Sequence, residues 1–586
     1  MRMVEPLISL CMIVKDEADT LSRCLESVQG AADEIVIVDT GSTDETVAIA
    51  RAFAAEVLHE PWNGDFAAAR NKGLEAAKGK WILFLDADEA LESTHRSELR
   101  QWAALEEYEG FFLQVRNYVG NGEQGATVNP ILRLFRNRPE HRFQGRIHEQ
   151  IAASIVKRSP GAPFHLTEIV IHHYGYQQAY VEAKDKVNRN MTLLQEAVAA
   201  EPDDPFYRYN LGVEYLRSGQ PEQAFLHFRK ASSAIDPLAV SYAHLLAKYE
   251  IRCKQALGQW EEALELARQA LSLFPDYTDL WHVRAQCERA LSRPGEAVAS
   301  LLEAMKRGAP PPSYHTEEGI GTYQTAYLLG EVAEEQGDYE EALLWYKEAV
   351  NSCASLTPPL YRIFHLLRVT GREGDIPRRL AEDFRLTSDG AWAKIVAILL
   401  QCGCARAAAD LLHHKRGRRL PEAMRRMALA EVELLRGDSR SARHKLTASF
   451  GKVREDKAKL QLGAFAEQLR WLSGGSGPWR EPVARALAGD TDAENRMAAP
   501  MIWPQLGRLL AGSAAGGKRE AFDRITELWL QLLEQPDSRP EGADALALRL
   551  SALADRHLGA VVGAEGGMRD EALAATRLRL PTEDGL

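Results

Sequence analysis

Three short apolar runs, separated by helical stretches, constrain the fold of this chain more than any other feature of its sequence. The runs are nearly continuous in apolar residues, as expected of strands covered on both faces: Ile8 to Val14, Glu34 to Val38 and Trp81 to Leu85. The segments between them have helical character: Ala18 to Val28, Asp44 to Phe53 and Phe66 to Ala77. Strands that alternate with helices predict βαβ units and a mostly parallel sheet. We therefore expect an α/β domain at residues 1–180.

The last part of this domain has a different pattern. Its strand candidates are shorter and separated by polar loops: Gly110 to Tyr118, Ile131 to Phe135 and Glu168 to Tyr174. After about residue 185 the strand pattern ends, and residues rich in Ala, Leu, Glu and Arg follow at helical spacing.

Helical repeats are expected from residue 185 to 355. Gly219, Gly258 and Gly337 each stand between two helical segments with small residues at packing positions. The distance from Gly258 to Gly337 is 79 residues, about twice the length of a tetratricopeptide repeat. The pattern resembles such repeats, and an unrelated helical bundle is the alternative. Residues 356–562 are expected to form further degenerate repeats or a capping domain, and residues 563–586 a flexible tail.

Composition narrows the function. The chain has 586 residues and a net charge of −12, so we expect no nucleic-acid partner. No stretch approaches the ~20 apolar residues of a membrane span, and the apolar start runs directly into Lys15, as a buried strand rather than a signal peptide does. The seven scattered cysteines indicate reduced thiols in a cytoplasmic protein.

Acidic residues follow two of the apolar runs. Asp39 ends the second run before Gly41 and a helix start, where ligands bind in open α/β sheets. Asp86 and Asp88 follow the third run two residues apart, so their side chains fall on the same side of an extended chain. Clustered carboxylates favour a hard divalent cation such as Mg²⁺ or Mn²⁺. The alternatives are a capped turn at Asp39 and a solvated acidic turn at Asp86.

Basic and histidine residues are further candidates. Arg70 and Lys72 on the preceding helix could reach a nucleotide or its phosphates. Two histidine motifs, His148-Glu149 and His172-His173, contain residue types that bind metals or titrate near neutral pH. The stretch before Glu149 is cationic through four arginines that could hold phosphates or an acidic acceptor: Arg133, Arg136, Arg142 and Arg146. An ordinary solvated surface is the alternative for each of these.

Four of these motifs in this order resemble the family 2 glycosyltransferases of the GT-A fold, which is Rossmann-like: Met12 to Glu17, Val38 to Asp44, Ala69-Arg70-Asn71 and Asp86 to Glu89. The resemblance covers about residues 7–180. With the repeats, the chain resembles the bacterial glycosyltransferases that carry tetratricopeptide repeats, a group that includes peptide S-glycosyltransferases.

The resemblance implies a donor, a metal and a set of site residues. The donor is a nucleotide-sugar, usually a UDP-sugar, the cofactor is Mn²⁺ or Mg²⁺, and transfer inverts the anomeric carbon. The nucleotide-sugar is implied to lie against Met12, Val14, Glu17, Asp39, Arg70, Asn71, Asp86 and Ala87. The implied metal ligands are Asp88, Asp86 and a histidine near the end of the domain, His173 before His172. The implied base is Glu149, with His148 as its rival, because this chain has His148-Glu149 where the family usually has Glu-Asp.

We therefore expect a cytoplasmic, metal-dependent inverting glycosyltransferase of hexosyltransferase type. Its helical repeats are expected to bind a peptide or protein acceptor, or a second copy of the chain as a homodimer. A glycan or lipid acceptor is the alternative. Two other classes compete: a nucleotidyltransferase, which lacks support because Lys15-Asp16-Glu17 replaces a glycine-rich loop, and a non-catalytic repeat scaffold, against which the intact Asp86-Ala87-Asp88 argues.

Overall fold

The computed structural model describes residues 5–118, 125–175, 186–384, 386, 388–436, 441 and 444–445. The chain divides after Val332 into two compact units, and each unit is described here by itself. The expected tail at 563–586, and the expected capping region beyond residue 445, lie outside the described residues.

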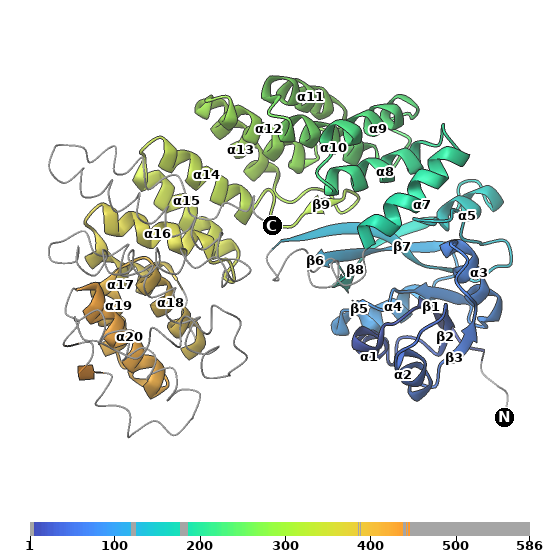
Figure 1. Ribbon diagram of the computed structural model, residues 1–586, viewed down its shortest axis with the longest axis horizontal. Helices are drawn as coiled ribbons and strands as arrows, with labels where there is room; N and C mark the ends of the chain where they lie inside the picture. Colours follow the sequence, from blue (N-terminus) through green and yellow to red (C-terminus); the bar gives the residue numbers. More distant parts are fainter. Residues whose placement is uncertain are drawn as a thin grey trace, which may run out of the picture. The chain divides into compact units, whose positions relative to one another are not determined.

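The first unit contains a nine-stranded sheet (Figure 1). Its strands are β1 Ile8–Val14, β2 Glu34–Asp39, β3 Glu56–His59, β4 Trp81–Phe84, β5 Glu89–Leu91, β6 Gly110–Tyr118, β7 Ala126–Arg136, β8 Phe164–His173 and β9 Thr316–Glu317. The order is β3-β2-β1-β4-β7-β6-β8-β5, with β9 paired to β7. Strands β3, β2, β1 and β4 are parallel, whereas β7 runs antiparallel to β4 and β6. The expected α/β architecture is therefore confirmed.

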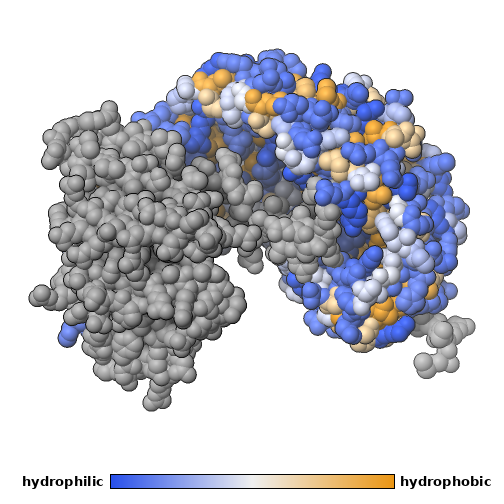
Figure 2. All heavy atoms as spheres, in the orientation of Figure 1, coloured by the Kyte–Doolittle hydropathy of each residue, from blue (hydrophilic) through white to orange (hydrophobic). Residues whose placement is uncertain are grey.

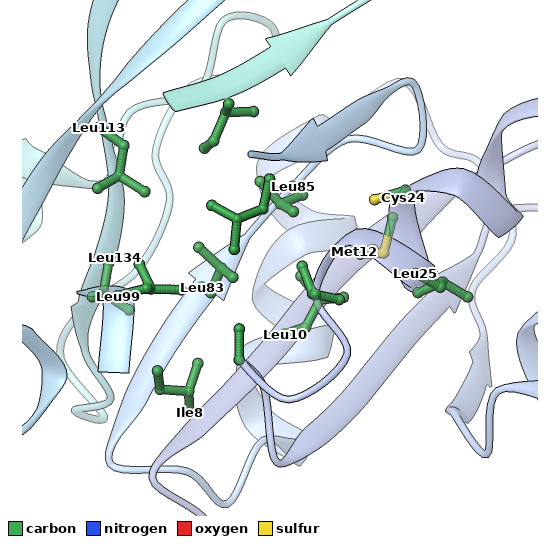
Figure 3. Packing of buried hydrophobic residues seen from close by; sticks show 14 of the residues in the cluster. Ile8, Leu10, Met12, Cys24, Leu25, Leu83, Leu85, Leu99, Leu113 and Leu134 are labelled. Carbon is green, nitrogen blue, oxygen red and sulfur yellow. The ribbon is translucent and has the colours of Figure 1, made fainter. Parts of the chain in front are cut away.

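Five helices accompany these strands: α1 Ala18–Ser27, α2 Thr46–Ala52, α3 Phe66–Ala76, α4 Arg96–Ala103 and α5 Ala152–Arg158. Helix α1 buries Cys24 and Leu25 against the sheet residues Leu10 and Met12 (Figure 3). All seven cysteines are free, and burial raises the pKa of the Cys11 thiol to about 12. This core fixes the carboxyl ends of β1, β2 and β4 at one edge of the sheet.

The helical part of the first unit consists of paired helices. They are α7 Lys186–Ala200, α8 Pro205–Arg217, α9 Pro221–Ser233, α10 Ala243–Ala256, α11 Trp260–Leu273, α12 Thr278–Ala290 and α13 Pro294–Arg307. The turns inside successive pairs contain Gly219, Gly258 and Ser292, all with positive φ (72°, 69° and 58°). Gly258 and Gly337, 79 residues apart, therefore enclose a further repeat whose turn residue is Ser292. Ser292 takes the left-handed conformation, so no glycine marks this turn in the sequence.

The repeats are interrupted by the segment 308–322, called here the insert, which contains β9. On one side β9 pairs with β7, with Glu317 opposite Thr127. On the other side α10 and α12 bind the same segment: Nζ of Lys248 lies 2.7 Å from the Glu317 carboxylate, and Asp279 accepts the hydroxyl of Thr316 at 2.6 Å. The insert thus joins the repeats to the sheet through a strand that both of them bind.

Helix α14, Tyr323–Glu335, crosses the division between the units. The second unit continues with α15 Tyr339–Ser352, α16 Pro358–Val369, α17 Ile376–Asp383, α18 Asp389–Gln401, α19 Ala405–His413 and α20 Glu422–Leu435. Its turn glycines Gly337, Gly371 and Gly403 all have positive φ and follow one another at 34 and 32 residues (371 − 337 and 403 − 371). Repeat spacing therefore continues beyond residue 355, where the sequence signature fades.

Two observations concern possible contacts with other molecules. On the face shown in Figure 2, hydrophobic residues are scattered among hydrophilic ones over the repeat helices. Within the part of the chain that the structure describes, no helix is both long and apolar enough to cross a membrane.

Candidate functional site

Asp39 lies at the carboxyl end of β2, directly opposite Val14 at the end of β1. Its side chain is buried and accepts hydrogen bonds from the amides of Gly41 (3.3 Å) and Ser42 (3.0 Å) and faces Nδ1 of His59 at 3.2 Å. Burial opposes its charge, but the hydrogen bonds from Ser42 and His59 outweigh this and lower the pKa of Asp39. Asp39 is therefore an ionised acceptor at the sheet edge.

The loop after β1 is tied to the loop after β2. Asp16, with φ of 52°, accepts the amide of Thr43 at 2.7 Å, and the amide of Glu17 donates to the hydroxyl of Thr46 at 2.7 Å. Met12 and Val14 are buried in β1. These contacts hold the backbone around Glu17 and Asp39 in one place without a ligand.

Arg70 lies between two acidic residues that are far apart in the sequence. On α3, its Nη2 donates to Oδ1 of Asp86 at 2.7 Å, and its Nε donates to Oε1 of Glu149. The guanidinium is 9% exposed and lies over the rings of Phe84 and Phe143. One arginine thus links the end of β4 to the loop that carries Glu149.

Arg133 is a second cation at this position. From β7 its Nη2 lies 3.6 Å from Asp86 and 2.5 Å from Glu89, which is fully buried. Partial burial opposes the charge of Asp86, but Arg70 and Arg133 hold its pKa well below the usual range. Burial raises the pKa of Glu89 although it faces Arg133. Asp86 is therefore directed to two arginines.

Asp88 is directed to a different partner. Its Oδ1 lies 3.4 Å from Nε2 of His173 on β8, and Nδ1 of His173 lies 2.8 Å from Oδ1 of Asn117. This amide oxygen can only accept, so Nδ1 of His173 donates its proton to Asn117 and Nε2 is the nitrogen that faces Asp88. Burial favours a neutral ring, but Asp88 and Glu89 outweigh it and raise the pKa of His173.

His172 points away from this pair. Its Nδ1 lies 2.8 Å from the hydroxyl of Tyr118 and its Nε2 lies 2.9 Å from Glu92. Neighbouring residues on a strand face opposite sides of a sheet. The structure therefore brings His173, and not His172, next to Asp88.

The backbone of Gly175 packs directly against the Asp88 carboxylate, and only a glycine fits there. A Cβ atom at Gly175 would lie 2.0 Å from Oδ2 of Asp88 and 2.8 Å from Nε2 of His173. Ala87, between the two aspartates, is buried. A larger residue than glycine at 175 would fill the position next to both polar groups.

Asp88 and His173 fit a divalent cation with two protein ligands. Among the described residues, no group of three or more His, Cys, Asp or Glu side chains is arranged to hold a metal ion. Mg²⁺ is commonly held by one or two carboxylates, with phosphate oxygens of the substrate and water completing its coordination. A carboxylate and an imidazole at this position could therefore hold a divalent cation together with phosphate oxygens of a substrate.

The loop with Glu149 is supported by the first repeat. The amide of Phe66 donates to the carbonyl of Arg146 at 2.9 Å, and Ile147 packs in one cluster with Leu194 of α7 and Leu211 of α8. The side chain of Asn71 binds the backbone of Phe143 in both directions, at 3.0 and 2.8 Å. Asn71 therefore fixes the start of this loop.

His148 has an unusual environment in the same loop. Its φ is 52°, and its Nε2 is buried with no hydrogen-bond partner among the described residues. Burial and the nearby Arg217 of α8 lower the pKa of His148 to about 4. The ring is therefore neutral at physiological pH, next to the carboxylate of Glu149.

The four arginines of the cationic stretch have separate positions. Of the four, only Arg133 contacts the acidic cluster, which consists of Asp86, Asp88 and Glu89. Arg136 lies over Trp81 and donates to backbone carbonyls. Arg142 donates to the carbonyls of Arg138 and His141, and Arg146 lies 3.6 Å from Glu196. The exposed Lys72 faces Glu75 at 3.9 Å.

Comparisons with known proteins identify the families that match the two parts of this chain. The family model "Glycosyl transferase family 2" matches residues 9–157, and two tetratricopeptide-repeat models match residues 250–287 and 323–355. A relative from Synechococcus elongatus, "TPR repeat-containing protein Synpcc7942_0270", is 35% identical over 307 residues, which are 50% of this chain and 75% of the relative.

Another relative is the SPbeta prophage-derived glycosyltransferase SunS of Bacillus subtilis. It is 29% identical over 229 residues, and the match covers 39% of this chain and 53% of SunS, so the chain spans about half of that relative. The crystal structure of S. aureus TarS 1-349 is 14% identical, with 46% of this chain and 92% of that chain covered. Its TM-score of 0.27 gives the structural likeness no weight.

Proposed function

Because the chain belongs to the family 2 glycosyltransferases that carry C-terminal tetratricopeptide repeats, we propose that it transfers a sugar from a UDP-sugar to a peptide or protein side chain. The transfer inverts the anomeric carbon, needs Mn²⁺ or Mg²⁺, and takes place in the cytoplasm. The proposal rests on two sets of side chains near the carboxyl ends of the strands. One is Asp88 with His173, and the other is Arg70 with Asp86 and Glu149.

The donor lies across the carboxyl ends of β1, β2 and β4 in this proposal. Asp39, held ionised by backbone amides, accepts hydrogen bonds from the uracil or ribose, and the backbone from Met12 to Val14 lines the nucleoside. Asp88 and His173 would hold the cation, which would supply Lewis-acid stabilisation of the leaving diphosphate. Arg70 and Arg133 bring positive charge to the same edge.

Glu149 is the proposed base. It accepts the proton of the attacking side chain while the bond from the anomeric carbon to the diphosphate breaks. Arg70 holds one carboxylate oxygen, which fixes the direction of the other. His148 is the rival base, and its lowered pKa keeps its ring neutral, but its Nε2 is buried.

The repeats support a peptide or protein acceptor, because stacked helical repeats form surfaces that bind extended chains. Helices α10 and α12 already bind one extended segment of this chain, the insert. We therefore propose that the acceptor approaches along α7 and α8, which pack beside the loop of Glu149.

The test begins with the donor. We expect one UDP-sugar to be hydrolysed slowly by the full-length protein with Mn²⁺, and not after chelation or in Asp88→Ala. Transfer is then measured with peptide, protein and free glycan acceptors. Transfer to a glycan or lipid alone would contradict the peptide acceptor, and turnover that persists in Asp88→Ala would contradict the metal site.

A further inference from the structure

A pocket of about 510 Å³ lies against strands β6, β7 and β8. It is on the face of the sheet that points away from Asp88 and His173. Arg116 of β6 pairs in register with His172 of β8, and both line it, together with Glu318 of the insert. His173, the next residue on β8, faces Asp88 on the other side. The pocket is therefore separate from the proposed donor site, and its volume is in the ~300–1,000 Å³ range of small-molecule sites.

The charged groups of this pocket are already paired. Oε2 of Glu92 lies 2.9 Å from Nε2 of His172, and Nη2 of Arg116 donates to Oε2 of Glu318 at 2.6 Å. Neither an anion nor a cation finds an unmatched opposite charge here. A charged ligand would have to be desolvated without compensation, so the lining favours a neutral one.

The pocket nevertheless has spare hydrogen-bonding capacity. The amide of Gln114, which lines the pocket, makes long contacts, 3.5 Å to the carbonyl of Thr167 and 3.4 Å to that of Pro312. Such groups gain from a ligand with many hydroxyls, which both donate and accept.

An apolar surface lies between the polar groups. Val128 of β7 and Val170 of β8 line the pocket beside Glu92 and Gln114. A sugar ring has both properties, since its C–H face packs on apolar side chains while its hydroxyls reach polar ones. The ring of His172 is also part of the lining and is held in place by stacking on Tyr118, with ring centres 5.9 Å apart.

The repeats complete the pocket before any ligand binds. Glu318 follows Glu317, whose carboxylate is bound by Lys248 at 2.7 Å and by Arg252. Glu318 therefore has a fixed position opposite the sheet, and the ligand need not order the insert.

We propose that this pocket is a second sugar site, which binds a neutral monosaccharide or disaccharide independently of the nucleotide-sugar. Nothing in this proposal requires that the chain transfers sugar, because the pocket has its own polar groups and lies on the other face of the sheet.

The test measures sugar binding to the full-length protein in the absence of nucleotide. Binding is detected by saturation-transfer NMR. The probes are glucose, galactose, N-acetylglucosamine and their disaccharides, with inorganic phosphate and an acidic peptide as charged probes. We expect a neutral sugar to bind with millimolar affinity and the charged probes not to bind. The absence of binding by all the neutral sugars, or binding of a charged probe that the pocket variants abolish, would overturn the proposal.

Variants assign the binding to the pocket. Val128→Trp fills it, and Val156→Trp, at a valine 44% exposed on α5, is the matched control. We expect at least about tenfold weaker sugar binding in the first and wild-type binding in the second. If thermal denaturation shows that Val128→Trp is not folded, Thr94→Trp is used instead. Thr94 is exposed and lines the same pocket, so a tryptophan there also blocks it. Unchanged binding in the folded blocking variant would overturn the proposal.

The two proposals fail separately. A protein that transfers sugar but binds none of the neutral probes retains its proposed function and loses the second site. A protein that binds a neutral sugar in the pocket but turns over no nucleotide-sugar retains the second site and loses the proposed function.

Discussion

Nε2 of His173 lies 3.4 Å from Oδ1 of Asp88, although 85 residues of sequence separate them (173 − 88). Strand β5, which pairs antiparallel with β8, creates this contact, with Glu89 opposite His173. Because a carboxylate and an imidazole are common metal ligands, this contact leads to a prediction about the metal dependence of the donor reaction.

We predict that Asp88→Ala lowers metal-dependent turnover of the nucleotide-sugar by about 10²–10³-fold, because the cation loses its only proposed carboxylate ligand. Mn²⁺ binding, measured by calorimetry with UDP present, should weaken in parallel. Asp19→Ala, at an exposed aspartate of α1, is the control and should behave as wild type. Equal Mn²⁺ affinity in the two variants would show that the cation is held elsewhere.

The same site predicts an effect of Gly175→Ala. A Cβ there would lie 2.0 Å from Oδ2 of Asp88, so the new methyl group displaces the carboxylate. We expect Mn²⁺-dependent turnover to fall at least about tenfold with little loss of UDP affinity without metal. Gly295→Ala in α13 is the control, because no atom lies within 4 Å of its Cβ and its φ is not positive. A Gly175→Ala variant with wild-type metal dependence would contradict the assignment.

Arg70→Lys should separate charge from geometry. The lysine keeps the positive charge near Asp86 but cannot reach both Asp86 and Glu149 in the planar manner of a guanidinium. We expect kcat for transfer to fall by about 10²-fold with a smaller change in the donor KM. Lys72→Ala, two residues along α3 and half exposed, is the matched control. A change in donor KM alone would mean that Arg70 binds the nucleotide and does not position Glu149.

Leu211→Ala tests whether the first repeat positions the loop of Glu149. Leu211 packs with Ile147 and is 2% exposed. The control is Leu264→Ala in the second repeat, equally buried but in another cluster. Both should cost roughly 2–5 kcal/mol of stability. Only Leu211→Ala should lower kcat for transfer, measured at a temperature where both variants remain folded; equal kcat values would argue against this coupling.

Acidification should release the insert. Burial lowers the pKa of His244 and His282 to about 4 and that of His315 to about 3, and Lys248 and Arg252 add to this effect while Asp279 and Glu317 oppose it. The neutral rings are favoured in the folded protein. Their contribution to stability is therefore complete above pH ~6.5 and is lost as the pH falls toward about 4 for His244 and His282 and about 3 for His315, roughly 3–5 kcal/mol for one ring.

Hydrogen exchange of peptides from residues 308–322 measures this directly. Protection should fall between pH ~6.5 and ~4.5 after correction for the intrinsic pH dependence of exchange. His315→Gln should reduce the effect, whereas His414→Gln, at an exposed histidine of the second unit, should not. Constant protection over this range would show that the three rings do not titrate with opening of the insert.

The parallel strands β1, β2 and β4 could be predicted from the sequence. They are buried on both faces, so almost all of their residues must be apolar. Strands β3 and β5 could not be predicted, because they are only four and three residues long. They are strands because they pair with β2 and β8. The first half of β7 contains Asn129 and Pro130, which indicate a loop, and is a strand because β6 and β9 pair with it.

The candidate site shows the same division. Asp39, Asp86 and Asp88 could be selected because each follows an apolar run. Arg133 and Asn117 complete the acidic cluster from strands that only the fold brings close. A signal existed for Arg133, since a single charge inside the apolar run Ile131 to Phe135 must face a partner. The roles of these residues in binding and catalysis remain predictions.

The insert lengthens the spacing between two repeat turns, but the sequence alone does not reveal this. The turn residues Ser292 and Gly337 are 45 residues apart, whereas Gly258 and Ser292 are 34 apart (337 − 292 and 292 − 258). The excess of 11 residues was hidden because Ser292 takes the left-handed conformation that glycine takes in the other turns.

The shared strand β9 has a consequence for how this protein can be recombined. A fusion of two independent modules can be cut and rejoined at the linker between them. Here the repeats contribute a strand to the sheet, and the sheet contributes the partner of that strand. A chimera that replaces the repeats must therefore carry the 308–322 segment together with Lys248 and Asp279, and the unit of exchange is larger than either module.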